Sequence, residues 1–206
     1  MLSGIIFYKT FVVSSTLMSL TPGIDTAVAT RMVVAGGRSA GIAAAFGIAL
    51  GVLWQSTLAG LGLVAIFTAM PYVFNIVKYA GAAYLIYLGI RALYDSVRRI
   101  QAEDNLPSVK ASRAFAAGFL GDALNPKITI FIVTFYPQFI DTAHLDDLLP
   151  YVLLGATYAF IALIWYIIYA FIAMKLLGRL GRNFGIIMTR VSGLVLLGMG
   201  LLSFFN

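Results

Sequence analysis

The chain has 206 residues, of which 61% are hydrophobic and 11% charged, and its mean hydropathy is +0.96. A globule of this length has too little interior for so many apolar residues, so the composition predicts a protein of the lipid bilayer. The formal net charge of +6 needs no nucleic acid to explain it. Cysteine is absent, which excludes disulfides and cysteine-ligated metals, and the single histidine, His144, makes any metal site or cofactor unexpected.

Apolar runs separated by helix breakers predict an all-α integral membrane protein with six transmembrane helices. Uncharged stretches of 39 residues after Arg38 and 27 residues after Asp147 exceed the roughly 20 that a spanning helix needs. Lys9 interrupts the first apolar run and no cleavage site follows, so we expect no cleavable signal peptide. The expected spans are 5–35, 40–69, 72–94, 113–140, 149–174 and 186–205.

Helix breakers fall inside the first and fourth of these spans, half a chain apart. They are the dipeptides Pro22-Gly23 and Asn125-Pro126. A proline removes a backbone donor, and in hydrocarbon each freed backbone group must find another partner. Interrupted segments at corresponding places of two halves indicate a transporter with its substrate or ion site near the bilayer midplane. We therefore expect two inverted three-helix repeats, 1–94 and 113–206, joined by a polar cytoplasmic linker, 95–112, with helices 1 and 4 broken in mid-membrane.

The basic residues are distributed unevenly between the two sides of this topology. Loops 1–2, 3–4 and 5–6 and the adjoining helix ends hold eleven of the fourteen: Arg31, Arg38, Arg91, Arg98, Arg99, Lys110, Arg113, Lys175, Arg179, Arg182 and Arg190. The 4–5 loop is acidic instead, with Asp141, Asp146 and Asp147. The positive-inside rule then places the basic loops in the cytoplasm and both termini outside.

Several motifs together resemble the LysE/RhtB family of bacterial amino-acid exporters, over essentially the whole chain. They are Pro-Gly in span 1, the loop from Gly37 to Gly41, the KYAGAAYLIYLG run of span 3, and Asn-Pro-Lys followed by Pro-Gln-Phe in span 4. The resemblance implies export of amino acids or related metabolites across the bacterial inner membrane by alternating access, driven by protons. Two positions depart from the family pattern: Ile24 replaces a frequent second proline, and Asp122 replaces a common asparagine.

Three ionisable residues near the breaks are the first candidates for a site, because a charge at the centre of a spanning helix costs about 2.5–3.5 kcal/mol. Asp25 either caps the half-helix after Pro22-Gly23 or binds substrate. Asp122 and Lys127 either form a structural ion pair across the second break or serve transport. In the second case Asp122 titrates or binds an ammonium group, while Lys127 or the half-helix amides bind a carboxylate.

Two further polar residues are candidates with two interpretations each. Gln55 in span 2 either forms hydrogen bonds between helices or contacts the substrate. Lys78 at the start of span 3 is either a lysine that snorkels to the membrane interface or part of a gate or binding site. The expected substrate-binding or coupling residues are Pro22, Gly23, Asp25, Gln55, Lys78, Asp122, Asn125, Pro126 and Lys127.

The function that these observations favour is secondary active transport, and the resemblance implies protons as the coupling ion. No GxxxxGK[ST] motif for ATP occurs, and no catalytic arrangement of an enzyme stands out. A passive channel for small polar metabolites is the alternative. The sequence does not identify which amino acid is transported. It is compatible with a monomer and with a homo-oligomer.

Overall fold

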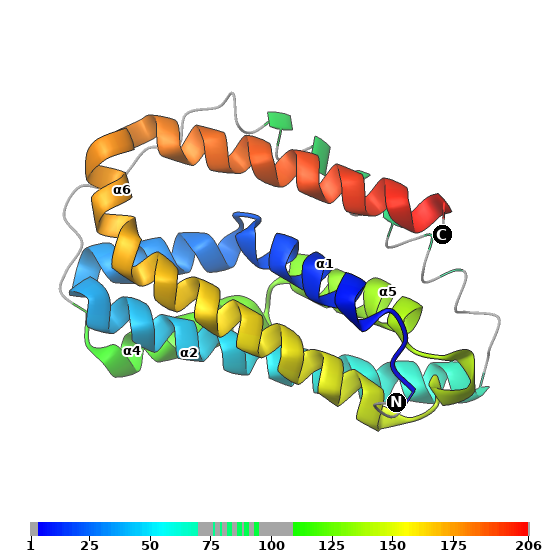
Figure 1. Ribbon diagram of the computed structural model, residues 1–206. Helices are drawn as coiled ribbons and strands as arrows, with labels where there is room; N and C mark the ends of the chain where they lie inside the picture. The colour runs from blue at the N-terminus through cyan, green and yellow to red at the C-terminus, as the bar shows by residue number, and fades with distance from the viewer. Residues whose placement is uncertain are drawn as a thin grey trace.

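The computed structural model describes residues 4–69 and 109–205, together with scattered positions between 76 and 94, and within them it is helical with no strand (Figure 1). Most of the third expected span and most of the expected linker lie outside the described residues. The elements are α1 (Tyr8–Leu20), α2 (Ile24–Ala69), α4 (Ala111–Ala123), α5 (Pro126–Phe135), the 3-10 turns η1 (Tyr136–Phe139) and η2 (Thr142–His144), and α6 (Leu148–Phe205).

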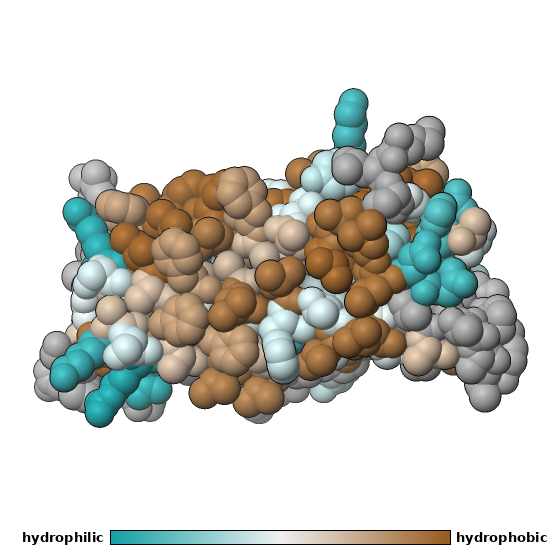
Figure 2. Space-filling model, turned by 90° about the horizontal axis from the view of Figure 1, so that it is seen from below, coloured by the Kyte–Doolittle hydropathy of each residue, from teal (hydrophilic) through white to brown (hydrophobic). Residues whose placement is uncertain are grey.

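Among the described helices, two are long and apolar enough to cross a bilayer, Ile24–Leu63 within α2 and Leu148–Ala173 within α6. The pair Ala111–Ala123 and Lys127–Phe139, bent by 51°, is a third if it is counted as one span. Figure 2 shows a face covered by hydrophobic residues, with most hydrophilic residues toward its ends. The all-α fold is therefore confirmed and its apolar spans are consistent with a membrane protein, whereas six helices in two inverted repeats stay a prediction.

Gly37 divides α2 into two parts that run in opposite directions (Figure 1). Its φ of 69° lies in a region that glycine adopts without a steric penalty. The boundary expected between spans 1 and 2 falls at this kink. The Val109 amide donates to the Ala35 carbonyl at 3.3 Å, so the start of α4 lies beside it. We call this region the kink end; it exposes the basic residues Arg38 and Lys110.

Two glycines hold α2 and α4 at close range. A Cβ on Gly47 would lie 2.1 Å from the Phe115 carbonyl oxygen, and a Cβ on Gly118 would lie 2.3 Å from that of Ala44. Only glycine fits such a close approach between helix backbones. Membrane helices use small residues in this way to pack closely, because lipid provides no hydrophobic driving force for their association. This helix pair therefore has no room for side chains at its crossing.

The opposite end of the molecule, which we call the loop end, joins the beginning of the chain to the segment after η1. Ile5 and Ile140 form an isolated antiparallel bridge, the Ile6 amide donates to the Phe139 carbonyl at 2.8 Å, and the Asp141 amide donates to the Gly4 carbonyl at 2.8 Å. The chain begins and ends on this side of the molecule (Figure 1). The bridge therefore connects two segments from opposite halves of the sequence.

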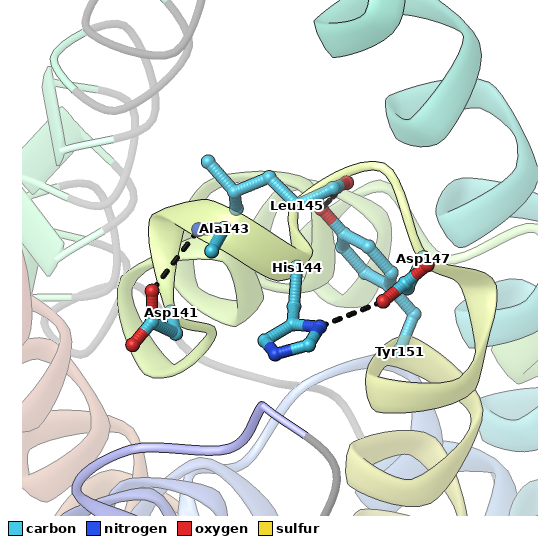
Figure 3. Close-up of polar contacts among 6 residues, drawn as sticks. All are labelled: Asp141, Ala143, His144, Leu145, Asp147 and Tyr151. Atoms are coloured by element: carbon cyan, nitrogen blue, oxygen red, sulfur yellow. Dashed lines mark hydrogen bonds and ion pairs between the residues drawn. The ribbon is translucent and has the colours of Figure 1, made fainter.

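The acidic loop at this end contains the single histidine (Figure 3). His144 Nδ1 lies 2.8 Å from an Asp147 carboxylate oxygen, and the Asp141 carboxylate accepts the Ala143 amide at 3.0 Å. The hydrogen bond to Asp147 raises the pKa of His144 above its ordinary 6.5, and the charges of the loop aspartates add to the effect. Tyr151 of α6 closes the loop by donating to the Leu145 carbonyl at 3.1 Å. Three side-chain bonds, from His144, Asp141 and Tyr151, therefore lie within the loop end.

Candidate functional site

The first helix break lies where the breaker dipeptide predicted it. α1 ends at Leu20, Thr21 has an extended backbone with φ −73° and ψ 112°, and α2 begins at Ile24. The Thr21 amide still donates back to the Leu17 carbonyl at 3.0 Å. The carbonyl oxygens of the last turn, by contrast, lose the donor that Pro22 cannot supply. The break therefore presents backbone acceptors inside the protein.

The second break is built differently, by an asparagine that caps a new helix. α4 ends at Ala123, and Asn125 precedes Pro126 at the first position of α5, where a missing amide hydrogen has no cost. The Asn125 Oδ1 accepts the Lys127 amide at 3.1 Å, which satisfies one free donor of the new helix. The backbone amide of Asn125 in turn donates to the Asp122 carbonyl at 2.7 Å.

The two breaks contact each other through side chains. Asn125 Nδ2 donates to an Asp25 carboxylate oxygen at 3.1 Å, and Lys127 Nζ donates to the Thr21 carbonyl at 3.0 Å. Gly23 leaves room for this lysine, since a Cβ there would lie 3.2 Å from Nζ. The structure therefore brings together residues that are about half a chain apart in sequence. We call this group of contacts the break site.

Asp25 and Lys127 consequently have roles more specific than the sequence could assign. The Asp25 Oδ2 accepts from the side chain of Asn125 and its Oδ1 has no hydrogen-bond partner, so among the described residues it accepts from no amide of its own half-helix. Lys127 compensates the opened backbone of the first break with its charge-assisted bond to Thr21. Each residue stabilises the break contributed by the other half.

Gln55 connects α2 to both sides of the second break. Its Nε2 donates to the Asp122 carbonyl, and its Oε1 accepts from Thr129 Oγ1 at 2.9 Å. Thr129 also donates to the Asn125 carbonyl at 3.1 Å, so one hydroxyl is shared between two acceptors. Sequence reasoning missed Thr129. Thr129 lies four residues after Asn125, on the same face of the helix that starts at the break, and this spacing is the signal that could have predicted it.

Asp122 differs from every other polar residue of the break site. Its side chain is 0% exposed, and within the described chain neither of its carboxylate oxygens has a hydrogen-bond partner. An ion pair with Lys127, one of the two alternatives, is not formed within the described chain, and Lys127 bonds to Thr21 instead. Gly51 of α2 faces the carboxylate so closely that a Cβ there would lie 2.8 Å from Oδ2. A buried carboxylate without a partner costs several kcal/mol unless it is neutral or meets a cation.

Comparison with known proteins decides the family. The family model of the LysE type translocator matches residues 16–205, which is nearly the whole chain. The chain belongs to the LysE type translocator family. The two breaks and the contacts between them fall within the matched residues, whereas the first eight residues of α1 precede them. Membership of this family indicates a membrane transporter rather than an enzyme.

The names of individual relatives of this LysE type translocator agree with the family. It is 29% identical to the uncharacterized membrane protein YrhP of Bacillus subtilis, over 90% of this chain and 92% of that protein. It is 31% identical to a leucine efflux protein of Klebsiella pneumoniae and 33% identical to one of Salmonella choleraesuis, each over 67% of this chain and 65% of the relative. No solved structure matches it.

The remaining expected site residues of this LysE type translocator are placed as follows. Pro22 is half-buried within the first break, and Ile24, where the family often has proline, begins α2 with 44% of its surface exposed. Pro126 occupies the first turn of α5. Lys78 lies outside the described residues, so its interpretations stay as the sequence left them.

Proposed function

We propose that this chain is a secondary active transporter that exports amino acids, or closely related metabolites, from the cytoplasm in exchange for protons. The observation that carries the proposal is the pair of side-chain bonds between the breaks, Asn125 to Asp25 and Lys127 to Thr21. A carboxylate, an ammonium and opened backbone groups meet there inside an apolar protein. The names of the leucine efflux relatives support an amino acid as the substrate.

The break site has the chemical groups that an amino acid requires. The half-helices that begin at Ile24 and Pro126 direct their positive N-terminal ends toward the breaks, where a substrate carboxylate is favoured together with Lys127. The unpartnered oxygens of Asp25 and Asp122 are acceptors for an α-ammonium group. Substrate would then compete for Lys127 with the Thr21 carbonyl, so binding and loosening of the contact between the breaks are coupled.

Asp122 is the residue that we assign to proton coupling. An exporter works against its substrate gradient, and a secondary transporter takes the energy from an ion gradient. A carboxylate whose surroundings alternate between wet and dry binds and releases a proton with each change of access. Asp25 already has a structural partner in Asn125, whereas the carboxylate of Asp122 has none within the described chain.

Flux measurements in proteoliposomes test the proposal. A panel of radiolabelled amino acids is offered with and without an imposed pH gradient, and we expect saturable transport of at least one of them that the gradient drives uphill. Unmodified substrate recovered afterwards excludes an enzymatic reaction. Flux that never saturates and never runs uphill would favour a passive channel. Absence of transport for every amino acid would refute the proposal.

We further propose that the protein lies in the bacterial cytoplasmic membrane with its kink end in the cytoplasm and both termini in the periplasm. The exposed Arg38 and Lys110 at the kink end and the aspartates of the loop end support this orientation. A C-terminal alkaline phosphatase fusion should be active and a green fluorescent protein fusion dark. The reverse pattern would overturn the orientation.

A further inference from the structure

We propose that two threonine–tyrosine pairs between α2 and α6 form the cytoplasmic gate of the transport pathway. The pairs are Thr26 with Tyr166 and Thr30 with Tyr169, and we call them the hydroxyl seam. The proposal rests on the alternating-access function proposed above and adds the residues that close one side of it.

The seam is a polar contact inside an apolar interface. Thr26 Oγ1 lies 3.3 Å from Tyr166 OH, and Thr30 Oγ1 lies 2.6 Å from Tyr169 OH. Both tyrosines are 3% exposed, and their rings meet edge to face with centroids 6.3 Å apart. The Thr30 hydroxyl donates to the Thr26 carbonyl at 2.7 Å, so in the shorter pair Tyr169 is the donor. The removal of one oxygen atom from Tyr169 therefore removes one defined bond.

The seam lies between the break site and the kink end. Thr26 follows Asp25 directly, and Thr30 is one turn further along α2 toward Gly37. Tyr166 and Tyr169 follow each other in the same direction along α6, and Figure 1 shows the two segments running toward the kink end together. Beyond the seam, the Arg38 guanidinium lies over the Phe171 ring, 5.7 Å from its centroid. The four hydroxyls thus line the route from Asp25 to the basic end.

The segment of α2 that carries the threonines is bounded by two points where the helix is interrupted. Residues 24–36 lie between the first break and the kink at Gly37, whose backbone is not helical. Beyond the kink, Gly41 lies between the two segments, since a Cβ there would lie 2.4 Å from Val33 Cγ2 and 2.8 Å from the Ala170 Cβ of α6. The two interruptions are the hinges about which residues 24–36 would tilt away from α6.

Hydroxyl pairs suit a contact that must open and close. When the segments part, each hydroxyl exchanges its partner for water, so opening leaves no buried polar group unsatisfied. The parted surfaces would line an aqueous path, the one place where exposed polar groups are tolerated at membrane depth. The tight glycine contacts of Gly47 and Gly118 give α2 and α4 no such freedom. The movable boundary is accordingly the one between residues 24–36 and α6.

The absence of cysteine from the chain allows a direct test by side-specific labelling. Ser19 is 3% exposed and two residues before Thr21, so Ser19→Cys places one reporter thiol beside the break site. A charged, membrane-impermeant methanethiosulfonate is added to inside-out or right-side-out vesicles. In the reporter background, Tyr169→Phe should raise the labelling rate from the cytoplasmic face about threefold, the shift that one average interhelical hydrogen bond produces. Thr30→Val should do the same, and the double variant no more than the larger single effect.

Tyr151→Phe is the matched control, because it removes one tyrosine hydrogen bond from the same helix at the loop end. It should leave labelling from the cytoplasmic face unchanged. Unchanged rates in both Tyr169→Phe and Thr30→Val, or an equal rise in Tyr151→Phe, would overturn the gate. A rise confined to the periplasmic face would overturn it as well. Failure of the exporter proposal would appear separately, as absent amino-acid flux in the unsubstituted protein, because labelling requires no known substrate.

Discussion

Replacement of Asp122 by asparagine separates the coupling role of this residue from a structural one. Asparagine keeps the shape of the side chain, which the close approach of Gly51 requires. A charged aspartate at the centre of a spanning helix costs about 2.5–3.5 kcal/mol, and within the described chain no partner offsets that cost here. Asp122→Asn should therefore be at least as stable as the unsubstituted protein, with a gain of up to about 3 kcal/mol if the carboxylate is charged.

Transport by this variant should change in the opposite sense to its stability. For one proton exchanged per substrate, a gradient of one pH unit supplies about 1.4 kcal/mol and sustains roughly a tenfold accumulation. The unsubstituted protein should approach that ratio in proteoliposomes, and Asp122→Asn should fall to a ratio of about one. Counterflow of labelled against unlabelled substrate, which needs no proton, should continue in the variant.

Two further variants make this result interpretable. Asp146→Asn removes a carboxylate from the exposed acidic loop and should leave the accumulation ratio unchanged. Asp25→Asn should reduce counterflow itself, because it alters the acceptor of the bond from Asn125. Gradient-driven accumulation at the full ratio in Asp122→Asn would refute the coupling role and place proton exchange elsewhere in the protein.

Three other predictions concern the frame around the site. Gly47→Ala should lower the free energy of unfolding by about 1–3 kcal/mol, because the added Cβ forces two helix backbones apart. Gly62→Ala is the control, since a Cβ there meets nothing within 4 Å, and it should leave stability unchanged or raise it by up to about 1 kcal/mol. Thermal unfolding in detergent compares the two variants. Gln55→Leu removes two buried interhelical hydrogen bonds, to the Asp122 carbonyl and from the Thr129 hydroxyl, and should cost about 1–3 kcal/mol in the same assay. Thr57→Val, which loses only a bond within its own helix, should change stability by about 0.5 kcal/mol or less. The hydrogen bond to the Asp147 carboxylate raises the pKa of His144. Protonated His144 therefore stabilises the acidic loop below pH 6.5, and this stabilisation is lost as the pH rises through the raised pKa. NMR titration of the imidazole measures the shift, and His144→Gln should abolish this pH dependence.

The helix breaks and their residues could be predicted from sequence because they rest on local chemistry. Pro22 and Pro126 each remove a backbone donor wherever they stand, and the asparagine before a proline is a helix cap in any context. The similar placement of the breaks in the two halves predicted that they belong together. The boundary between the first two spans, now seen as the kink at Gly37, followed from a glycine-rich loop with an arginine.

The partners of the site residues could not be predicted, because they depend on how the halves pack. Nothing local distinguishes a Lys127 that pairs with Asp122 from one that reaches the Thr21 carbonyl 106 residues away. The role of Gln55 was undecided for the same reason, since its contacts lie on α4 and α5. The pairs of the hydroxyl seam could not be predicted either, because a tyrosine in an apolar run does not reveal which residue its hydroxyl contacts.

The contact between the breaks has a consequence for the order in which the protein is made. Thr21 and Asp25 are synthesised 106 and 100 residues before the side chains that satisfy them. At roughly 5–20 residues per second, the first break waits on the order of 5–20 s for its partners. During that interval its carbonyl and carboxylate depend on water or on the insertion machinery for hydrogen bonds. The first break of this translocator therefore gains its hydrogen-bond partners only once Asn125 and Lys127 have been synthesised.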